Sequence, residues 1–155
     1  RWLNFNNPAL TQFAPTLVLP QAWVIFKNAD GGSDTWKTYD STLNNVAVTI
    51  PGFGTQNLNL KIVVNGNKST DTTVTVSGKS YTAKRYISTA RVGGYLVASP
   101  TTEAFYISIA TTFSLIDGVG IYQSNTPNSN LMALTGAALA KVPGNRSTLT
   151  SFMLK

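Results

Sequence analysis

Apolar and polar positions alternate along much of the chain. In Asn57–Val64 every second residue from Leu58 to Val64 is apolar, whereas Asn59 and Lys61 between them are polar. A period of two places the apolar side chains on one side of an extended chain, which is typical of a β-strand with one face in a core. The segment therefore predicts a strand that is half buried.

The same pattern predicts a series of further short strands. They are expected at Gln21–Phe26, Thr35–Tyr39, Val46–Ile50, Thr72–Val76, Ser80–Lys84, Arg85–Thr89, Gly94–Val97, Phe105–Phe113, Gly118–Tyr122 and Leu149–Leu154. Asn65-Gly66 favours a hairpin turn, so we expect the chain to reverse there, directly or after a longer loop through Lys68–Asp71. Other turns are expected at Ala29-Asp30-Gly31-Gly32, Pro51-Gly52, Ser77-Gly78-Lys79, Ser99-Pro100, Asp117-Gly118, Thr126-Pro127 and Pro143-Gly144.

Short strands separated by turn signals, with no alternation of strands and helices, favour an all-β fold. The simplest form is an antiparallel β-sandwich of the jelly-roll type. Only Asn130–Ala140 departs from the pattern, because it fits a short helix interrupted by Gly136 about as well as a buried strand. The order of the strands does not follow from the sequence.

Two predicted strands are apolar on both sides. In Gln21–Phe26 and in Phe105–Phe113 apolar residues occupy both odd and even positions, so that each face of the strand carries some of them. Such a strand is covered either by further chain or by another subunit, and exposed apolar patches often mark subunit contacts. The residues expected at an oligomer interface are Trp23, Ile25, Tyr106, Ile107 and Ile109.

The distribution of basic and apolar residues argues against binding to nucleic acid and against stable insertion in a membrane. The 155 residues include 12 basic and 6 acidic side chains, a net charge of +6, and no cysteine. The basic residues are scattered rather than gathered in a stripe with aromatic residues between them, so nucleic acid is not an expected partner. No run of apolar residues approaches the length of about 20 that spans a bilayer, so stable membrane insertion is not expected either.

Most catalytic groups are missing from the composition. The chain has no histidine, which is the commonest general base, and no cysteine, which supplies the thiol nucleophile of many enzymes. Six carboxylates remain for a glycosidase mechanism, Asp30, Asp34, Asp40, Asp71, Glu103 and Asp117, and five of them lie in or beside turn signals. Asn28–Asp34 resembles a calcium loop only poorly, and no phosphate-binding glycine motif occurs. We therefore expect no enzyme activity, metal or cofactor.

Two groups of side chains could bind a ligand. Lys84, Arg85 and Arg91 could hold a small anion, above all if a threefold axis brought three copies together, although charged residues at a strand edge are the simpler interpretation. Trp36 and Tyr39 lie in the polar run Asp34–Ser41, so they are the aromatic pair expected to be exposed. Flat aromatic faces of this kind suit a sugar ring.

In style the chain resembles the C-terminal knobs of bacteriophage tail needles and tail fibres. The likeness rests on strands rich in Thr, Asn and Gly, few charges, no cysteine, apolar strands such as Phe105–Phe113 and a terminal strand at Leu149–Leu154. It includes no diagnostic motif. Many such knobs are trimeric jelly rolls like tumour necrosis factor, so the resemblance implies a homotrimer with its contacts in flat β faces.

The resemblance also implies an organisation and a function. Residues 1–17 would join the domain to a preceding shaft, and residues 18–155 would form one knob. The knob would sit at the tail tip on the virion surface, contacting a bacterial cell-surface molecule or helping to penetrate the cell envelope. Two other classes stay open, a lectin-like module that binds sugar through Trp36 and Tyr39, and a small viral capsid or spike jelly roll.

Overall fold

The computed structural model describes residues 2–3, 22–23, 34–50 and 52–151. These residues form ten strands and no helix, and an all-β antiparallel fold is confirmed. The strands are β1 (Trp2–Leu3), β2 (Ala22–Trp23), β3 (Thr35–Ile50), β4 (Gly54–Val76), β5 (Lys79–Leu96), β6 (Ser99–Ile116), β7 (Gly120–Thr126), β8 (Ser129–Ala133), β9 (Ala138–Val142) and β10 (Asn145–Thr148). No helix that could cross a membrane occurs in these ranges.

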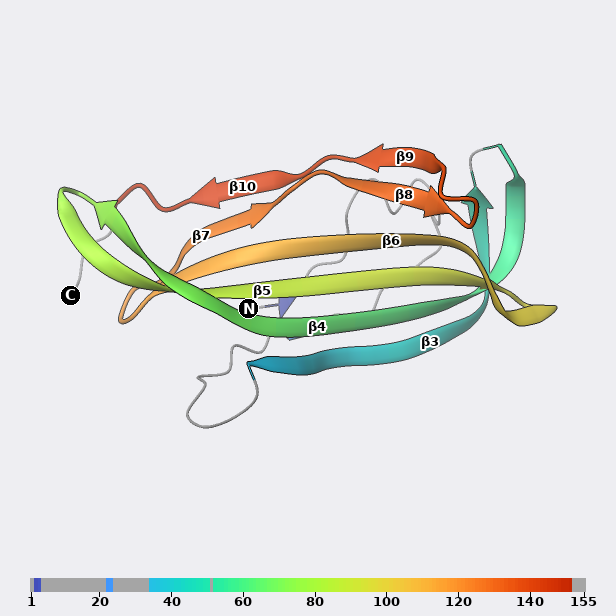
Figure 1. Cartoon of the computed structure of the whole chain (residues 1–155), viewed down its shortest axis with the longest axis horizontal. Coiled ribbons are helices and arrows are strands. Elements are labelled where there is room, and N and C mark those ends of the chain that lie inside the picture. The colour runs from blue at the N-terminus through green and yellow to red at the C-terminus, as the bar shows by residue number, and fades with distance from the viewer. Residues whose placement is uncertain (1, 4–21, 24–33, 51, 152–155) are drawn as a thin grey trace.

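Eight strands form one sheet, whose order follows the chain. Along β10-β7-β6-β5-β4-β3 each neighbour is antiparallel, and β8 pairs with both β6 and β9. β7 and β8 pair with successive parts of β6, so they lie end to end beside it, and β9 and β10 follow them in the same way (Figure 1). The sheet is in effect a meander of six long strands.

The central strands are unusually long. β4 has 23 residues and β5 and β6 have 18 each, against a usual length of about 5–6 residues. The last two strands of the meander, β7 with β8 and β9 with β10, are interrupted at Pro127 and Pro143, which have no backbone N–H for a sheet ladder. The long continuous strands give an elongated molecule with hairpins at both ends (Figure 1).

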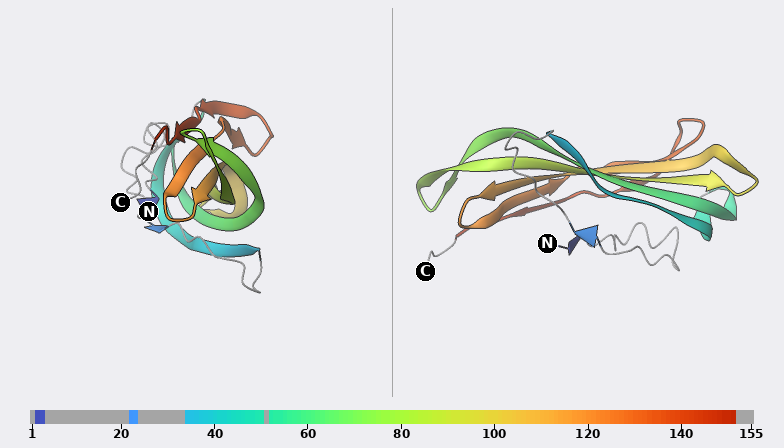
Figure 2. Two further views of the ribbon diagram at one scale, coloured as in Figure 1. Left: turned by 90° about the vertical axis from the view of Figure 1, so that its left-hand side faces the viewer. Right: turned by 90° about the horizontal axis from the view of Figure 1, so that it is seen from below.

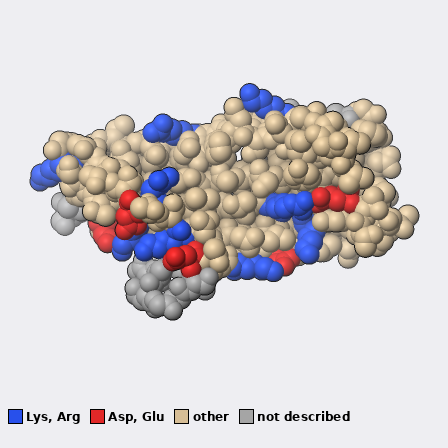
Figure 3. Space-filling model, in the orientation of Figure 1, with Lys and Arg blue, Asp and Glu red and all other residues tan. Residues whose placement is uncertain are grey.

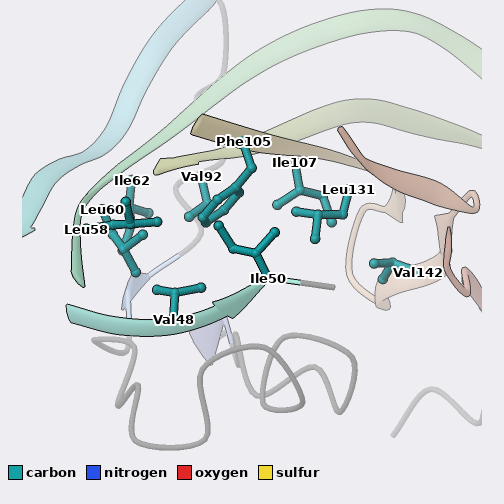
Figure 4. Packing of buried hydrophobic residues seen from close by; sticks show 10 residues of the cluster. All are labelled: Val48, Ile50, Leu58, Leu60, Ile62, Val92, Phe105, Ile107, Leu131 and Val142. Carbon is teal, nitrogen blue, oxygen red and sulfur yellow. The ribbon is translucent and has the colours of Figure 1, made fainter. Parts of the chain in front are cut away.

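The sheet is curled, and its inner face holds the larger core (Figure 2). Ten buried residues from β3 to β9 point into this space: Val48, Ile50, Leu58, Leu60, Ile62, Val92, Phe105, Ile107, Leu131 and Val142 (Figure 4). The predicted alternation in Asn57–Val64 is therefore confirmed, with its apolar side on the inner face. β6 follows the same rule, because Phe105 and Ile107 are buried while Tyr106 between them is partly exposed.

A smaller core lies on the opposite face of the same sheet. It consists of Val76, Ala83 and Ile116, at the end of the molecule that carries the β4–β5 and β6–β7 hairpins. Ala83 pairs with Ile116 in the same unbroken ladder in which Val92 pairs with Ile107. Since 83 and 92 differ by an odd number, their side chains point to opposite faces. One long sheet thus buries its inner face at one end and its outer face at the other.

The predicted reversal at Asn65-Gly66 is wrong. β4 runs straight through both residues, and Gly66 lies between Trp36 of β3 and Ser88 of β5. A Cβ on Gly66 would collide with the indole of Trp36, which covers the glycine. Here glycine serves a close approach across strands rather than a turn, a device known from aromatic side chains that cover glycines in sheets.

The hairpin expected at Ser77-Gly78 is confirmed. Ser77 and Gly78 have φ angles of 49° and 78°. Positive φ at both central residues is the geometry of the two-residue turn whose twist matches that of the flanking strands. The turn at Asp117-Gly118 is confirmed as well, whereas Ser99-Pro100 opens β6 and the reversal occurs at Val97-Ala98.

Residues 130–140 contain two strands joined by a turn. β8 and β9 occupy most of the segment, and the chain reverses between them with a φ of 80° at Gly136. The helical alternative is thus wrong. The strand expected at Leu149–Leu154 is also wrong for Leu149–Ser151, which lie outside any strand. Residues 152–155, most of Gln21–Phe26 and the turn at Ala29–Gly32 lie outside the described residues.

Candidate functional site

Two of the three basic residues expected at an anion site are paired with carboxylates. Lys84 lies 3.2 Å from Asp117, and Arg91 donates a 2.8 Å hydrogen bond to Glu103. The hydrogen bond that Arg91 donates to Glu103 raises the pKa of Arg91, and the bond that Lys84 donates to Asp117 raises the pKa of Lys84. These pairs already use much of the binding capacity that an anion would need.

A single chain does not bring the three basic residues together. Arg85 and Arg91 are six residues apart on one face of β5, about 20 Å at the rise of an extended strand. Lys84 faces the other side of the sheet, since neighbouring residues of a strand point in opposite directions. The expectation of one shared anion site is therefore wrong for the single chain.

Trp36 and Tyr39 do not form an exposed aromatic pair. Trp36 is only 9% exposed and packs edge-on against Tyr86, with ring centroids 6.3 Å apart. Tyr39 is half-buried and packs against the larger core. The polar residues around Trp36 suggested a solvent-facing segment, but the opposite strand offers Gly66, whose missing side chain leaves room for the indole. This correction removes the proposed sugar platform.

The five residues expected at an oligomer interface have different surroundings. Ile107 is 1% exposed and belongs to the core of its own chain, so the expectation is wrong for this residue. Ile109 is half-buried and packs against the same core. Tyr106 lies on the outer face, where the guanidinium of Arg91 sits 4.9 Å from its ring centroid. The side chain of Trp23 and residue Ile25 lie outside the described part of the chain.

Two of the carboxylates considered for catalysis share a surface hollow. Asp34 and Asp71 line a polar hollow of about 590 Å³ together with Lys68, Ser69 and Thr70. Asp40 is paired with Lys37 at 2.7 Å, and this hydrogen bond lowers the pKa of Asp40. The described residues include no group of three acidic side chains that could hold a metal ion.

Exposed apolar side chains gather at the opposite end from this hollow. The hairpins β3–β4, β5–β6 and β8–β9 turn at the same end of the meander (Figure 1). Their tips carry Phe53, 65% exposed, Leu134, 63% exposed, and Val97, 46% exposed. In a soluble domain a large apolar side chain on each of three adjacent turns is a feature that points to a contact surface. We call this end, formed by residues 52–57, 95–102 and 133–139, the apolar end.

A groove of about 340 Å³ opens between the three hairpins. Its walls are mostly apolar, and the lining residues are Ile50, Phe53, Gln56, Leu58, Leu96, Thr102, Ala104, Ala133, Leu134, Thr135 and Leu139. Leu58 at its base also belongs to the larger core. The groove is thus an extension of the core that remains open between the hairpins.

The apolar end carries no charged side chain. Residues 41–60, 92–102 and 118–140, which include its three hairpins, contain no Asp, Glu, Lys or Arg. The other end carries Lys79 and Asp117 in its two hairpins. In Figure 3 the outermost part of the apolar end, at the right, is tan, and most blue and red atoms lie in the middle and at the other end. The molecule is therefore polarised along its long axis.

Hydrogen bonds within the hairpins satisfy several backbone groups at the apolar end. The amide of Phe53 donates to the carbonyl of Ile50 at 3.0 Å, and its carbonyl accepts a bond from Gln56 Nε2 at 3.3 Å. The amide of Leu134 donates to the carbonyl of Ala104 at 3.1 Å. Because a bonded polar group loses little when water is removed, these tips are suited to a dry contact.

Sequence reasoning missed the apolar end, although its signal is in the sequence. Three uncharged stretches each contain an apolar residue beside a turn, at Phe53, Val97 and Leu134. Their meeting at one place depends on the strand order.

A comparison of the chain with family models, curated proteins and solved structures finds no match.

Proposed function

We propose that the chain is a non-enzymatic contact domain at the tip of a virion tail needle or fibre, and that its apolar end touches the host cell envelope. The single observation that carries the proposal is the polarity of the long axis, in which three uncharged hairpins with exposed Phe53, Val97 and Leu134 share one end.

The length of the strands supports a mechanical role. β4, β5 and β6 run most of the length of the sheet, so the β3–β4 and β5–β6 hairpins at the apolar end are continuous with strands that reach the other end. Long strands paired on both sides, β4 with β3 and β5 and β5 with β4 and β6, resist bending at any one point. A tip that presses on a surface requires such stiffness, and it requires no reacting group.

Assembly as a homotrimer is part of the proposal. Val63, Ile87, Tyr106 and Ala110 lie on the outer face of the sheet and are half-buried in the single chain. A neighbouring copy over this face would remove more of their apolar surface from water. Native mass spectrometry should then give three times the chain mass of 16.6 kDa, and a monomer at micromolar concentration would contradict this part of the proposal.

The lectin alternative loses its main support. Its sugar platform was Trp36 with Tyr39, and the indole of Trp36 is buried against Gly66 and Tyr86. On the outer face, Tyr106 is covered by Arg91 at 4.9 Å, which leaves less of its ring free to stack on a sugar.

Binding to bacterial envelope fragments tests the role of the apolar end. The variant Phe53→Asp with Leu134→Asp places two charges on exposed positions, so we expect it to fold and to lose binding. The matched variant Thr73→Asp with Thr75→Asp places two charges at exposed positions near the other end and should bind like the wild type. Co-sedimentation of the purified chains with the fragments gives the comparison. Equal binding by both variants would refute the proposal.

A further inference from the structure

We propose that the partner of the apolar end is the surface of an anionic phospholipid layer, with the hairpin tips entering the boundary between headgroups and acyl chains. This inference rests on the proposed function and names the class of partner. It describes a shallow and reversible contact and not a segment that spans a bilayer. Three properties of the apolar end carry it: its polar groups, the position of two exposed lysines and its shape.

The polar groups at the tips can leave water at low cost. An unbonded amide or carbonyl costs several kcal/mol in hydrocarbon, which excludes most loops from that environment. At the two most exposed apolar residues, the amides of Phe53 and Leu134 are both bonded within the chain. In the β5–β6 hairpin, the hydroxyls of Ser99 and Thr102 form a hydrogen bond of 2.8 Å with each other. Several polar groups of the tips thus have a hydrogen-bond partner within the chain.

Two exposed lysines lie at the depth that lipid headgroups would occupy. Lys61 is three residues from Leu58, where β4 meets Leu96 of β5, and this distance is about 10 Å along a strand. Lys141 is likewise three residues from Ala138, where β9 begins, and both lysines are exposed. Apolar groups enter a lipid surface by about 5–10 Å, so these ammonium groups would reach the anionic headgroups.

The shape of the apolar end favours lipid over a folded partner. Phe53, Val97 and Leu134 project from three separate turns around a groove. A protein interface usually has a flat apolar centre with a polar rim that forms about one hydrogen bond per 100–200 Å². Here the three turns carry no charge, the adjacent Glu103 is already paired with Arg91, and other polar groups are in part bonded within the chain. A fluid lipid layer can close around separate projections without matching polar groups.

Flotation with lipid vesicles tests the inference. The probes are vesicles of phosphatidylethanolamine with phosphatidylglycerol, and vesicles of phosphatidylcholine alone. We expect the wild-type chain to float with the anionic vesicles. The affinity of the variant Phe53→Asp with Leu134→Asp for these vesicles should be lower by about tenfold or more. The matched variant Thr73→Asp with Thr75→Asp should float like the wild type. Lys61→Gln with Lys141→Gln should lower binding to the anionic vesicles only, because headgroup attraction is electrostatic.

The outcomes separate this inference from the proposed function. A wild-type chain that does not float, or an apolar-end variant that floats equally well, overturns the lipid inference. If the chain still binds envelope fragments through its apolar end, the proposed function stands and the partner is a protein or a glycan. If neither vesicles nor fragments distinguish the two double variants, both proposals fall. Circular dichroism of each variant establishes that it is folded.

Discussion

At the scale of single residues, glycines and aromatic side chains account for the main differences between expectation and structure. The pair Asn65-Gly66 has the composition of a turn, and local preference alone gives no reason to doubt it. Its actual role depends on Trp36, thirty positions earlier in the chain, whose indole covers Gly66. Gly94 lies under Phe105 in the same manner. Contacts between distant residues of this kind cannot be inferred from a window of neighbouring residues.

This contact predicts an unusual response to a small substitution. Gly66→Ala should lower the free energy of unfolding by about 1–3 kcal/mol, because the added methyl group meets the indole, although alanine is generally no worse than glycine in a strand. Asn65→Ala, at the exposed neighbouring position, is the matched control. Urea denaturation measures both. In a Trp36→Ala background the penalty of Gly66→Ala should vanish, and a penalty that persists there would refute this explanation.

At the scale of elements, the alternation of apolar and polar residues was a good guide to the buried face of a strand. It was a poorer guide to the residue at which the strand ends. The inner positions of β4 and β6 match the pattern, and the turns at Ser77-Gly78 and Asp117-Gly118 are where expected. The predicted short strands at Thr35–Tyr39 and Val46–Ile50 are parts of β3. Polar residues at bulges, such as Asn45 with its φ of 55°, interrupt the pattern without ending the strand.

Adjacent residues of β6 should therefore respond very differently to the same change. Ile107→Asp should prevent stable folding, because it places an unpaired carboxylate among Val92, Leu131 and the rest of the larger core. Ser108→Asp, one residue further, should leave the single chain folded, because in that chain its carboxylate faces water on the outer face, opposite Arg91 of β5. Thermal unfolding followed by circular dichroism compares them. Similar melting temperatures for the two variants would contradict the assigned faces.

At the scale of the whole molecule, the meander places three uncharged turns with exposed apolar residues at the same end. In a meander alternate hairpins lie at the same end, so the uncharged turns after β3, β5 and β8 meet, and the charged turns after β4 and β6 lie at the other end. The strand order was not available from the sequence, and the candidate site therefore could not be predicted. The exposed aromatic pair at Trp36 and Tyr39 was wrong for the same reason, because it depended on a neighbour across the sheet. An anion site at Lys84, Arg85 and Arg91 within one chain is excluded by their places on β5, whereas such a site between copies stays a prediction.

The lack of cysteine in the chain makes a direct test of the apolar end possible. A single cysteine introduced by Leu134→Cys, or by Thr75→Cys near the other end, can carry an environment-sensitive fluorophore such as NBD. On mixing with anionic vesicles, we predict a blue shift and a rise of emission for the label at position 134 and no change at position 75. Equal changes at both positions, or a change at position 75 alone, would contradict the assignment of the apolar end as the contact surface.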